Sequence, residues 1–108
     1  MTLADLFTLL NSTATFENKV AYRAFPVGNA PDLPYICILA TNTDNFNADN
    51  KVYKVIQGVD VELYTENKEP DTEAALEAVL DGADIPWDRF EEFLDSENCY
   101  QITYEISI

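Results

Sequence analysis

The sequence contains no histidine and only three glycines in 108 residues. Histidine is the commonest general base at neutral pH and the usual partner of serine and cysteine nucleophiles, so its absence removes the most frequent routes to catalysis. Neither a glycine-rich phosphate loop nor a nucleophile elbow is present. We therefore expect no enzyme activity, no catalytic residues and no cofactor.

Basic residues are also scarce. Six Lys and Arg stand against 20 Asp and Glu, which gives a net charge of −14. Such a surface repels phosphate backbones and anionic membranes, so neither sequence-driven nucleic-acid binding nor membrane attachment is expected. An acidic protein can still act beside DNA, either by mimicking it or by lining a conduit through which DNA slides without sticking.

Long apolar runs and zinc-type cysteine spacings are absent as well. No run approaches the roughly 20 apolar residues needed to cross a bilayer, and no signal peptide is recognisable. Cys37 lies in the apolar run 35–40, and Cys99 opens the last predicted strand. We expect both to be free, buried thiols, and the chain to be cytosolic or part of a particle assembled in the cytosol.

The strongest pattern that is present covers residues 52–65. Side chains there alternate with a period of two, which indicates a half-buried β-strand. Four apolar side chains are predicted to share its inner face: Val55, Val59, Val61 and Leu63. Its outer face would carry Lys54, Asp60 and Glu62. We predict that this is the central strand of the domain.

A first helix is predicted over residues 2–11. Thr2 can cap it, and Asp5 sits where a carboxylate complements the positive end of the helix dipole. The spacing of its apolar residues is helical, with a core stripe of Leu3, Leu6, Phe7 and Leu10.

A second helix is predicted to begin at residues 69–71 and to end at Gly82. Asp71 is the predicted cap, and Glu73 is expected to complement the helix dipole. Its core stripe would be Leu76, Val79 and Leu80.

Four further segments read as strands: residues 20–25, 35–40, 85–94 and 99–108. Residues 35–40 are apolar on both faces, which predicts cover on both sides or a subunit interface. Residues 85–94 contain Pro86 and adjacent acids, which are typical of an edge strand. The order α-β-β-β-α-β-β has connections that look too short for parallel crossovers. We predict one α+β domain over residues 1–108, with a mostly antiparallel sheet of about five strands and two helices on one face.

Between two of these strands, residues 41–51 are rich in Asn and Asp and are predicted to form a polar loop. Calcium ligation is not expected, because no register gives the EF-hand spacing, and no other metal site is predicted. The loop is either simply flexible or orders on contact with a partner, with an aromatic anchor in a polar rim. The candidate partner-binding residues are Asp44, Asn45, Phe46, Asn47, Asp49 and Asn50.

Paired carboxylates occur at Asp60 and Glu62 and at Glu91 and Glu92. In so acidic a chain, a solvated strand face explains such pairs better than general acid–base chemistry, which requires burial to shift a pKa.

Three stretches carry a resemblance to a known family: FNADNKVY, GVDVELYT and, after an acidic helix, ENCYQITYEISI. Together they resemble small siphophage and prophage proteins of low-GC Gram-positive bacteria that are encoded among head–tail joining genes. Within that set the chain is similar to the tail-terminator, or tail-completion, group. The likeness extends from about residue 20 to residue 108.

The resemblance implies an α+β domain that forms a hexameric ring, caps the tail tube, ends its polymerisation and joins the tail to the head. The implied partners are further copies of the chain, the major tail tube protein and a head-completion or connector protein. DNA would pass through the lumen without specific binding, and no membrane is involved. The implied location is the head–tail junction of the virion, after assembly in the host cytoplasm. The family has no catalytic residues to carry over.

Two alternatives remain open. The first is the neighbouring head-completion or stopper role, since those proteins share small size and acidity. The second is an acidic DNA mimic that inhibits a host nuclease. Such mimics need carboxylates at phosphate-like spacing over a continuous surface, whereas here acids are interleaved with apolar residues on the predicted strands.

Overall fold

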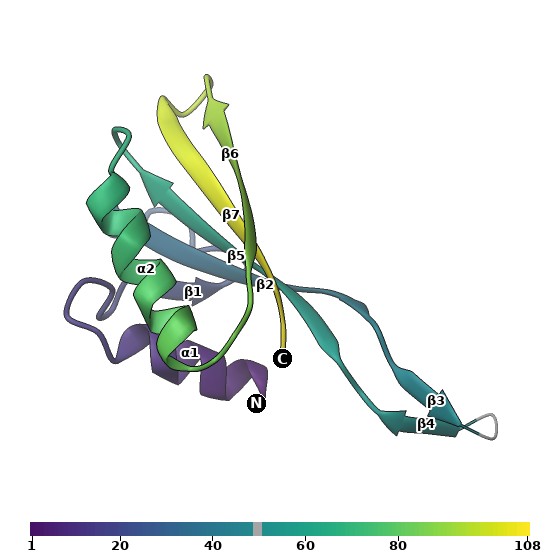
Figure 1. Ribbon diagram of the computed structural model, residues 1–108. Helices are drawn as coiled ribbons and strands as arrows, with labels where there is room; N and C mark the ends of the chain where they lie inside the picture. Colours follow the sequence, from purple (N-terminus) through teal and green to yellow (C-terminus); the bar gives the residue numbers. More distant parts are fainter. Residues whose placement is uncertain (49–50) are drawn as a thin grey trace.

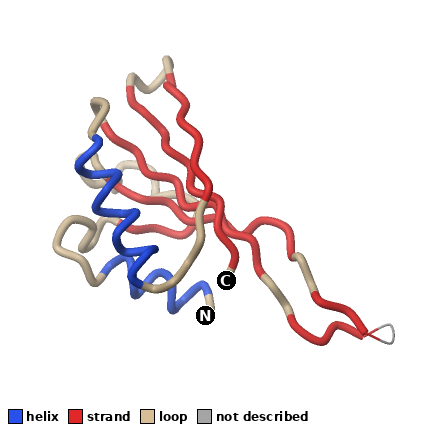
Figure 2. Tube along the Cα trace, viewed as in Figure 1, coloured by secondary structure: helices blue, strands red, loops and turns tan. Residues whose placement is uncertain are grey.

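The computed structural model describes residues 1–48 and 51–108, with the backbone alone described for residues 46–48 and 51–54. Two helices pack on one face of a five-stranded sheet, and a two-stranded hairpin extends away from this body (Figures 1 and 2). The predicted α+β class, the predicted element order and the placement of both helices on one face are confirmed.

The sheet has the order β1-β2-β5-β7-β6, so the central strand is the predicted one. In that order the strands are β1 (Val20–Tyr22), β2 (Tyr35–Thr43), β5 (Gln57–Thr65), β7 (Cys99–Ser107) and β6 (Asp88–Leu94). Every pair is antiparallel except β1 with β2. The expectation that all connections are too short for a parallel pair was wrong here, because residues 23–34 are numerous enough for a crossover.

The first helix, α1 (Leu3–Asn11), begins as predicted. Thr2 Oγ1 accepts a hydrogen bond from the Asp5 backbone N–H at 3.1 Å, and the Asp5 carboxylate accepts one from the Thr2 N–H at 3.0 Å. This reciprocal capping satisfies two N–H groups that a helix start otherwise leaves unpaired. Leu6 and Leu10 are fully buried. Phe7, predicted to join them, is instead 36% exposed at the margin of the sheet.

The second helix, α2 (Pro70–Gly82), has Glu69 rather than the predicted Asp71 at its N-cap position. Pro70 occupies the first helical position, where the missing N–H has no intrahelical partner to lose. Asp71 therefore lies inside the first turn, and no side-chain cap hydrogen bond forms. Leu76 and Leu80 are fully buried as predicted.

The core lies between the helices and the sheet. β5 buries alternate residues, namely Val59, Val61, Leu63 and Thr65. From β7, Tyr104 lies opposite Val61 and Ile102 lies opposite Leu63, so the core side chains of neighbouring strands meet in rows. In β7 Ile102, Tyr104 and Ile106 are buried on one face as predicted, but Cys99 and Thr103 on the opposite face are buried as well. β6 is an edge strand as predicted, although it begins at Asp88 rather than at residue 85.

The predicted single strand over residues 52–65 is two strands in the structure. β4 (Lys51–Lys54) is separated from β5 by Val55 and Ile56, and Val55 is 61% exposed rather than on the core face. No helix covers Val55, which lies beyond the last pairing of β5 with β7. The predicted loop over residues 41–51 was also wrong. Its first part extends β2, and its second part contains β3 (Phe46–Ala48), which pairs with β4.

Candidate functional site

The hairpin of β3 and β4, with the residues that join it to the sheet, forms an arm over residues 44–56. The arm projects from the end of β2 and β5 (Figure 1). It contains all six candidate partner-binding residues. Asp44 is exposed and Asn45 is half-buried, Phe46 and Asn47 lie in β3, and Asp49 and Asn50 lie outside the described residues. A contact role for these residues remains a prediction.

The root of the arm is held by one backbone–backbone hydrogen bond and by two hydrogen bonds between a side chain and the backbone. The Asp44 N–H donates to the Ile56 carbonyl oxygen at 2.8 Å, and the Ile56 N–H donates to Asn45 Oδ1 at 3.4 Å. Gln57 Nε2 donates at 2.9 Å to the carbonyl oxygen of Thr41. These bonds continue the pairing of the two strands past the irregular register of β2. The arm is therefore an extension of the sheet and not a separate unit.

Gly58 allows the close approach of β2 at this root. A Cβ atom at position 58 would lie 2.6 Å from Thr41 Oγ1 and 2.7 Å from the Asn42 carbonyl oxygen. The Thr41 side chain could rotate away, whereas the Asn42 oxygen belongs to the backbone. The sequence places at this position the one residue type that fits without moving the backbone.

The sheet face that the helices leave uncovered is called here the open face. Its side chains come from four strands: Tyr35, Cys37, Leu39, Asp60, Glu62, Tyr64, Gln101, Thr103, Glu105, Asp88, Phe90 and Glu92. At one side the segment 23–34 lies against it, with the Phe25 ring 5.1 Å from that of Tyr35. The apolar outer face predicted for residues 35–40 is thus partly covered by the chain itself. Cys37 and Cys99 are buried free thiols as predicted, and burial raises the pKa of Cys37 to about 11.

Three carboxylates form a row across the open face. Asp60 on β5 lies opposite Glu105 on β7, which in turn lies opposite Asp88 on β6. Neighbouring strands are about 4.8 Å apart, so these like charges face one another at short range. None of the three takes part in an ion pair among the described side chains.

A groove of about 590 Å³ contains this row. It lies where the open face meets the arm root and is called here the acidic groove. Its lining includes Thr41, Asp60, Trp87, Asp88, Glu105 and Ser107, and no Lys or Arg is among the described residues that line it. The groove is therefore negative and open to solvent, unlike the largely apolar pockets that hold most small-molecule ligands.

Beside the groove, Glu62 is tied into a hydrogen-bonded group. Tyr64 Oη donates to Glu62 Oε1 at 3.1 Å, while Gln101 Nε2 donates to Glu62 Oε2 at 3.0 Å and to Tyr64 Oη at 2.9 Å. Burial raises the pKa of Glu62, the Tyr64 hydrogen bond opposes this, and the charge of Asp60 adds to it. Burial and Glu62 also raise the pKa of Tyr64, so this hydroxyl does not act as a base near neutrality.

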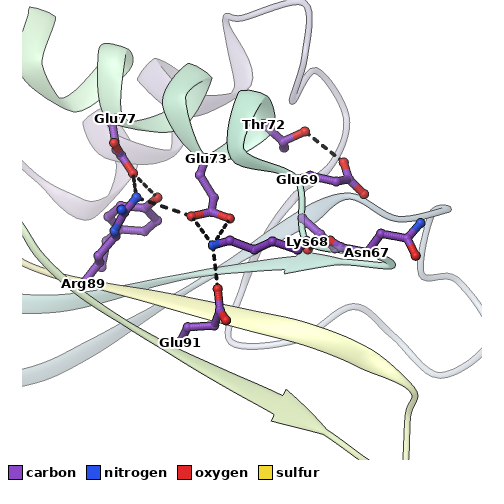
Figure 3. Close-up of polar contacts among 10 residues, drawn as sticks. Asn67, Lys68, Glu69, Thr72, Glu73, Glu77, Arg89 and Glu91 are labelled. Carbon is purple, nitrogen blue, oxygen red and sulfur yellow. Dashed lines mark hydrogen bonds and ion pairs between the residues drawn. The ribbon is translucent and has the colours of Figure 1, made fainter.

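The only ion-pair cluster among the described side chains lies between α2 and β6 (Figure 3). Glu73 is 2% exposed and receives Lys68 Nζ at 2.7 Å and Arg89 Nη1 at 3.3 Å. Lys68 also reaches Glu91 at 2.6 Å, and Arg89 pairs with Glu77. The hydrogen bonds that Lys68 donates to Glu73 and Glu91 raise the pKa of its ammonium group. Each carboxylate here has a cation, so the cluster fastens the helix to the edge strand.

Sequence reasoning missed the burial of Glu73, which was expected only to complement the helix dipole. A signal was available, because Glu73 precedes Leu76 by three residues and Leu80 by seven, so it belongs to the buried stripe. The acidic groove was missed for another reason. Asp60, Asp88 and Glu105 lie on three strands, and their alignment depends on register that the sequence does not display.

Within residues 1–48 and 51–108, no group of three or more His, Cys, Asp or Glu residues is arranged to hold a metal ion. Across the same residues no helix is both long and apolar enough to span a membrane. No family model, curated protein or solved structure matches the chain.

Proposed function

We propose that this chain is a structural protein of a siphophage virion that caps the tail tube as a ring, ends its polymerisation and joins the tail to the head. The mechanism is one of surfaces and not of chemistry. One side of the ring complements the last ring of tube subunits, and the other lacks what a further tube subunit needs. The chain is not an enzyme in this proposal.

The observation that carries the proposal is the pairing of a projecting arm with an uncovered sheet face on one small domain. The arm extends from the body, whose three axes with the arm included measure 49 × 28 × 24 Å. The open face carries five carboxylates, and none of them forms an ion pair with a described side chain: Asp60, Glu62, Asp88, Glu92 and Glu105. Both features suit a protein that completes its contacts on assembly. They agree with the assembly role that the resemblance implies.

The charge also suits a component of a DNA conduit. A net charge of −14 keeps phosphate backbones from binding the wall, and a basic patch there would hold DNA and slow its passage. Of the six basic residues, Lys68 and Arg89 are engaged by carboxylates of the same chain. In this proposal DNA passes through the ring without binding to its wall.

The DNA-mimic alternative has less support. A mimic presents carboxylates over a continuous surface. On the open face the row of Asp60, Glu105 and Asp88 is followed by a row with one acid, Glu62, which accepts hydrogen bonds from Tyr64 and Gln101. The other members of that second row are uncharged: Cys37, Thr103 and Phe90. The head-completion role shares every feature used above, and it differs only in which ring the protein contacts.

Tube growth in vitro tests the proposal. The tail tube protein of a phage that encodes this chain would be polymerised with purified chain at a few copies per tube, and tube lengths would be measured by electron microscopy. At this low ratio a capping ring should make the tubes shorter and more uniform in length. The ring should also be visible at one end of each tube. Unchanged lengths together with binding to the portal side of the neck would instead identify a head-completion protein and contradict capping.

The DNA-mimic alternative is tested in parallel by competition with DNA for a basic nuclease. Displacement of DNA at equimolar chain, with no effect on tubes, would replace the proposal by that alternative. A denatured sample of the chain controls for nonspecific effects of its charge in both assays.

A further inference from the structure

The two edges of the five-stranded sheet carry opposite charge. β1 and β6 are the first and last strands of the sheet, and neither has a second partner strand among the described residues (Figure 1). Residues 18–31, which include β1, contain Lys19 and Arg23 and no acid, on a chain with 20 Asp and Glu. Residues 88–97, which include β6, contain five acids and one base.

Lys19 and Arg23 stand at the two ends of β1. The Lys19 carbonyl oxygen accepts a hydrogen bond from the Ile36 N–H at 2.8 Å, and the Arg23 N–H donates to the Ile38 carbonyl oxygen at 2.8 Å. Between them Val20 is buried in the core under the helices, so strand alternation gives positions 19 and 23 to the open face. Lys19 is half-buried and Arg23 is exposed, and neither forms an ion pair with a described side chain.

β6 carries two unpaired charges at the same spacing. Asp88 and Glu92 are exposed on the open face, and neither forms an ion pair with a described side chain. Phe90 lies between them and is 52% exposed. Both pairs of charges are four positions apart, which is about 13 Å along a strand. Two cations on one edge therefore match two acids on the other.

We propose that the β1 edge of one copy lies antiparallel beside the β6 edge of a second copy, with Lys19 opposite Glu92 and Arg23 opposite Asp88. β1 and β6 run in opposite directions within the sheet. A second copy turned about an axis along the strands therefore presents its β6 antiparallel to β1, with the same face outward. Of the possible antiparallel registers that keep the faces aligned, this one gives both cations an acid.

Side chains, and not a long backbone ladder, define this contact. β1 has three residues, and Val20 among them is only 6% exposed. Tyr22 is 52% exposed beside it, and the register places Ala21 opposite Phe90. The contact thus combines two ion pairs with exposed aromatic rings, which a water-facing edge otherwise leaves uncovered.

Charge also distinguishes this contact from a symmetric one. Two β1 edges paired antiparallel about their centres place Lys19 opposite Arg23, and two β6 edges place Asp88 opposite Glu92, so like charges meet in both cases. Contact between unlike edges repeats head to tail and closes into a ring when the rotation between copies allows it. The inference deepens the proposed function and rests on it for the closed ring, while the contact itself is a property of the purified chain.

Charge reversal tests the contact. The variants Lys19→Glu/Arg23→Glu and Asp88→Lys/Glu92→Lys would each be examined by sedimentation velocity beside the unaltered chain. Either reversal makes the two edges repel, so each variant alone should associate at least about tenfold more weakly. The unaltered assembly should also weaken as salt rises from about 0.05 M to about 0.5 M.

Mixing the two variants should restore assembly. Each reversed edge then meets a reversed edge and each normal edge meets a normal one, so alternating copies recover the association of the unaltered chain. Lys51→Glu/Lys54→Glu and Glu66→Lys/Asp71→Lys make the same two charge changes away from the edges and should assemble normally. Circular dichroism and thermal melting establish that each variant is folded before its association is compared.

Cysteine cross-linking tests the register. In Ala21→Cys/Phe90→Cys the two thiols lie on different edges, and directly opposed positions of antiparallel strands are close enough for a disulfide after a small movement. Oxidation should link copies into a ladder of multimers on a denaturing gel. Ala21→Cys/Phe93→Cys moves the second thiol to the other face of β6 and should cross-link much less. The unaltered chain, with Cys37 and Cys99 buried, gives the background.

Four results would overturn the inference. Assembly of either charge variant at unaltered strength would place the contact elsewhere, and the proposed function would stand if that variant still capped tubes. Failure of two folded variants to rescue each other would show that the two edges are not partners, and an assembled chain without the cross-link would contradict the register. An unaltered chain that stays monomeric at millimolar concentration would remove the contact, and the tube-length assay would then decide the proposed function separately.

Discussion

Asp60 and Glu105 lie directly opposite each other on β5 and β7, on the face of the sheet that no helix covers. Asp88 continues the row on β6. Like charges in directly opposed positions leave a repulsion within the isolated domain.

Replacing one member of this row should stabilise the monomer. Glu105→Gln removes a cross-strand repulsion, so the free energy of unfolding of the monomer should rise by about 0.2–1 kcal/mol. Urea unfolding of the variant and of the unaltered chain measures the difference. Glu17→Gln, an exposed acid before β1, is the matched control.

A monomer that loses stability on the Glu105→Gln change would contradict this interpretation. Such a loss would mean that the carboxylate has a favourable partner within the chain.

In the cluster around Glu73, removing the cations alone should destabilise the protein more than removing the cations together with the buried carboxylate. Lys68→Met/Arg89→Met leaves a buried carboxylate without a cation, and we expect a loss of about 3 kcal/mol in the free energy of unfolding. Adding Glu73→Leu to that variant should restore most of the loss, because the buried charge is gone and the apolar side chain packs with Leu76 and Leu80. Chemical denaturation of the three proteins checks both steps. If the triple variant were no more stable than the double variant, the lost stability would come from lost packing and not from the unpaired Glu73 carboxylate.

The pH dependence of stability should carry a contribution from Glu62. Burial raises its pKa in the folded state above the value of about 4.5 in the unfolded chain, so the folded state holds this proton more tightly. The contribution therefore favours folding at low pH and falls as pH rises from about 4.5 through the folded pKa. Glu62→Gln removes the penalty while an amide oxygen can still accept from Tyr64.

The difference in unfolding free energy between Glu62→Gln and the unaltered chain isolates this effect from the other 19 acids. It should be smallest at about pH 4 and should grow in favour of the variant as pH rises toward about 7. A difference that is constant with pH would show that the change acts through packing or hydrogen bonding alone.

Gly58 should be intolerant of even the smallest side chain. The Cβ of Gly58→Ala would lie 2.7 Å from the Asn42 carbonyl oxygen, so β2 has to shift, at a cost of about 1–3 kcal/mol. The shift would also redirect the arm. Thermal melting measures the loss of stability. Gly82→Ala, which meets no atom within 4 Å, is the control and should be neutral or slightly stabilising.

Sequence patterns predicted the layers well because most of the core repeats regularly. The period of two in β5 and β7 and the capped stripe of α1 each bury one face, and such patterns determine structure locally. The pattern failed at Val55, whose alternation continues into a region that the sheet no longer covers. It failed also at residues 41–51, where strand pairing in a hairpin overrides the low strand propensity of Asn and Asp.

The candidate site was less accessible to sequence reasoning. The arm residues were singled out by composition, whereas the acidic groove depends on the register that aligns Asp60, Glu105 and Asp88. That register results from packing across the whole sheet, so no local pattern contains it.

The central claim, that the chain ends tail growth and joins the tail to the head, is tested most directly by negative-stain microscopy of a lysate from a phage that lacks this gene. The account predicts filled capsids beside unattached tails of uncontrolled length, with normal particles restored when the chain is supplied from a plasmid. Normal, infectious particles without the gene would contradict it and would place the protein outside the virion.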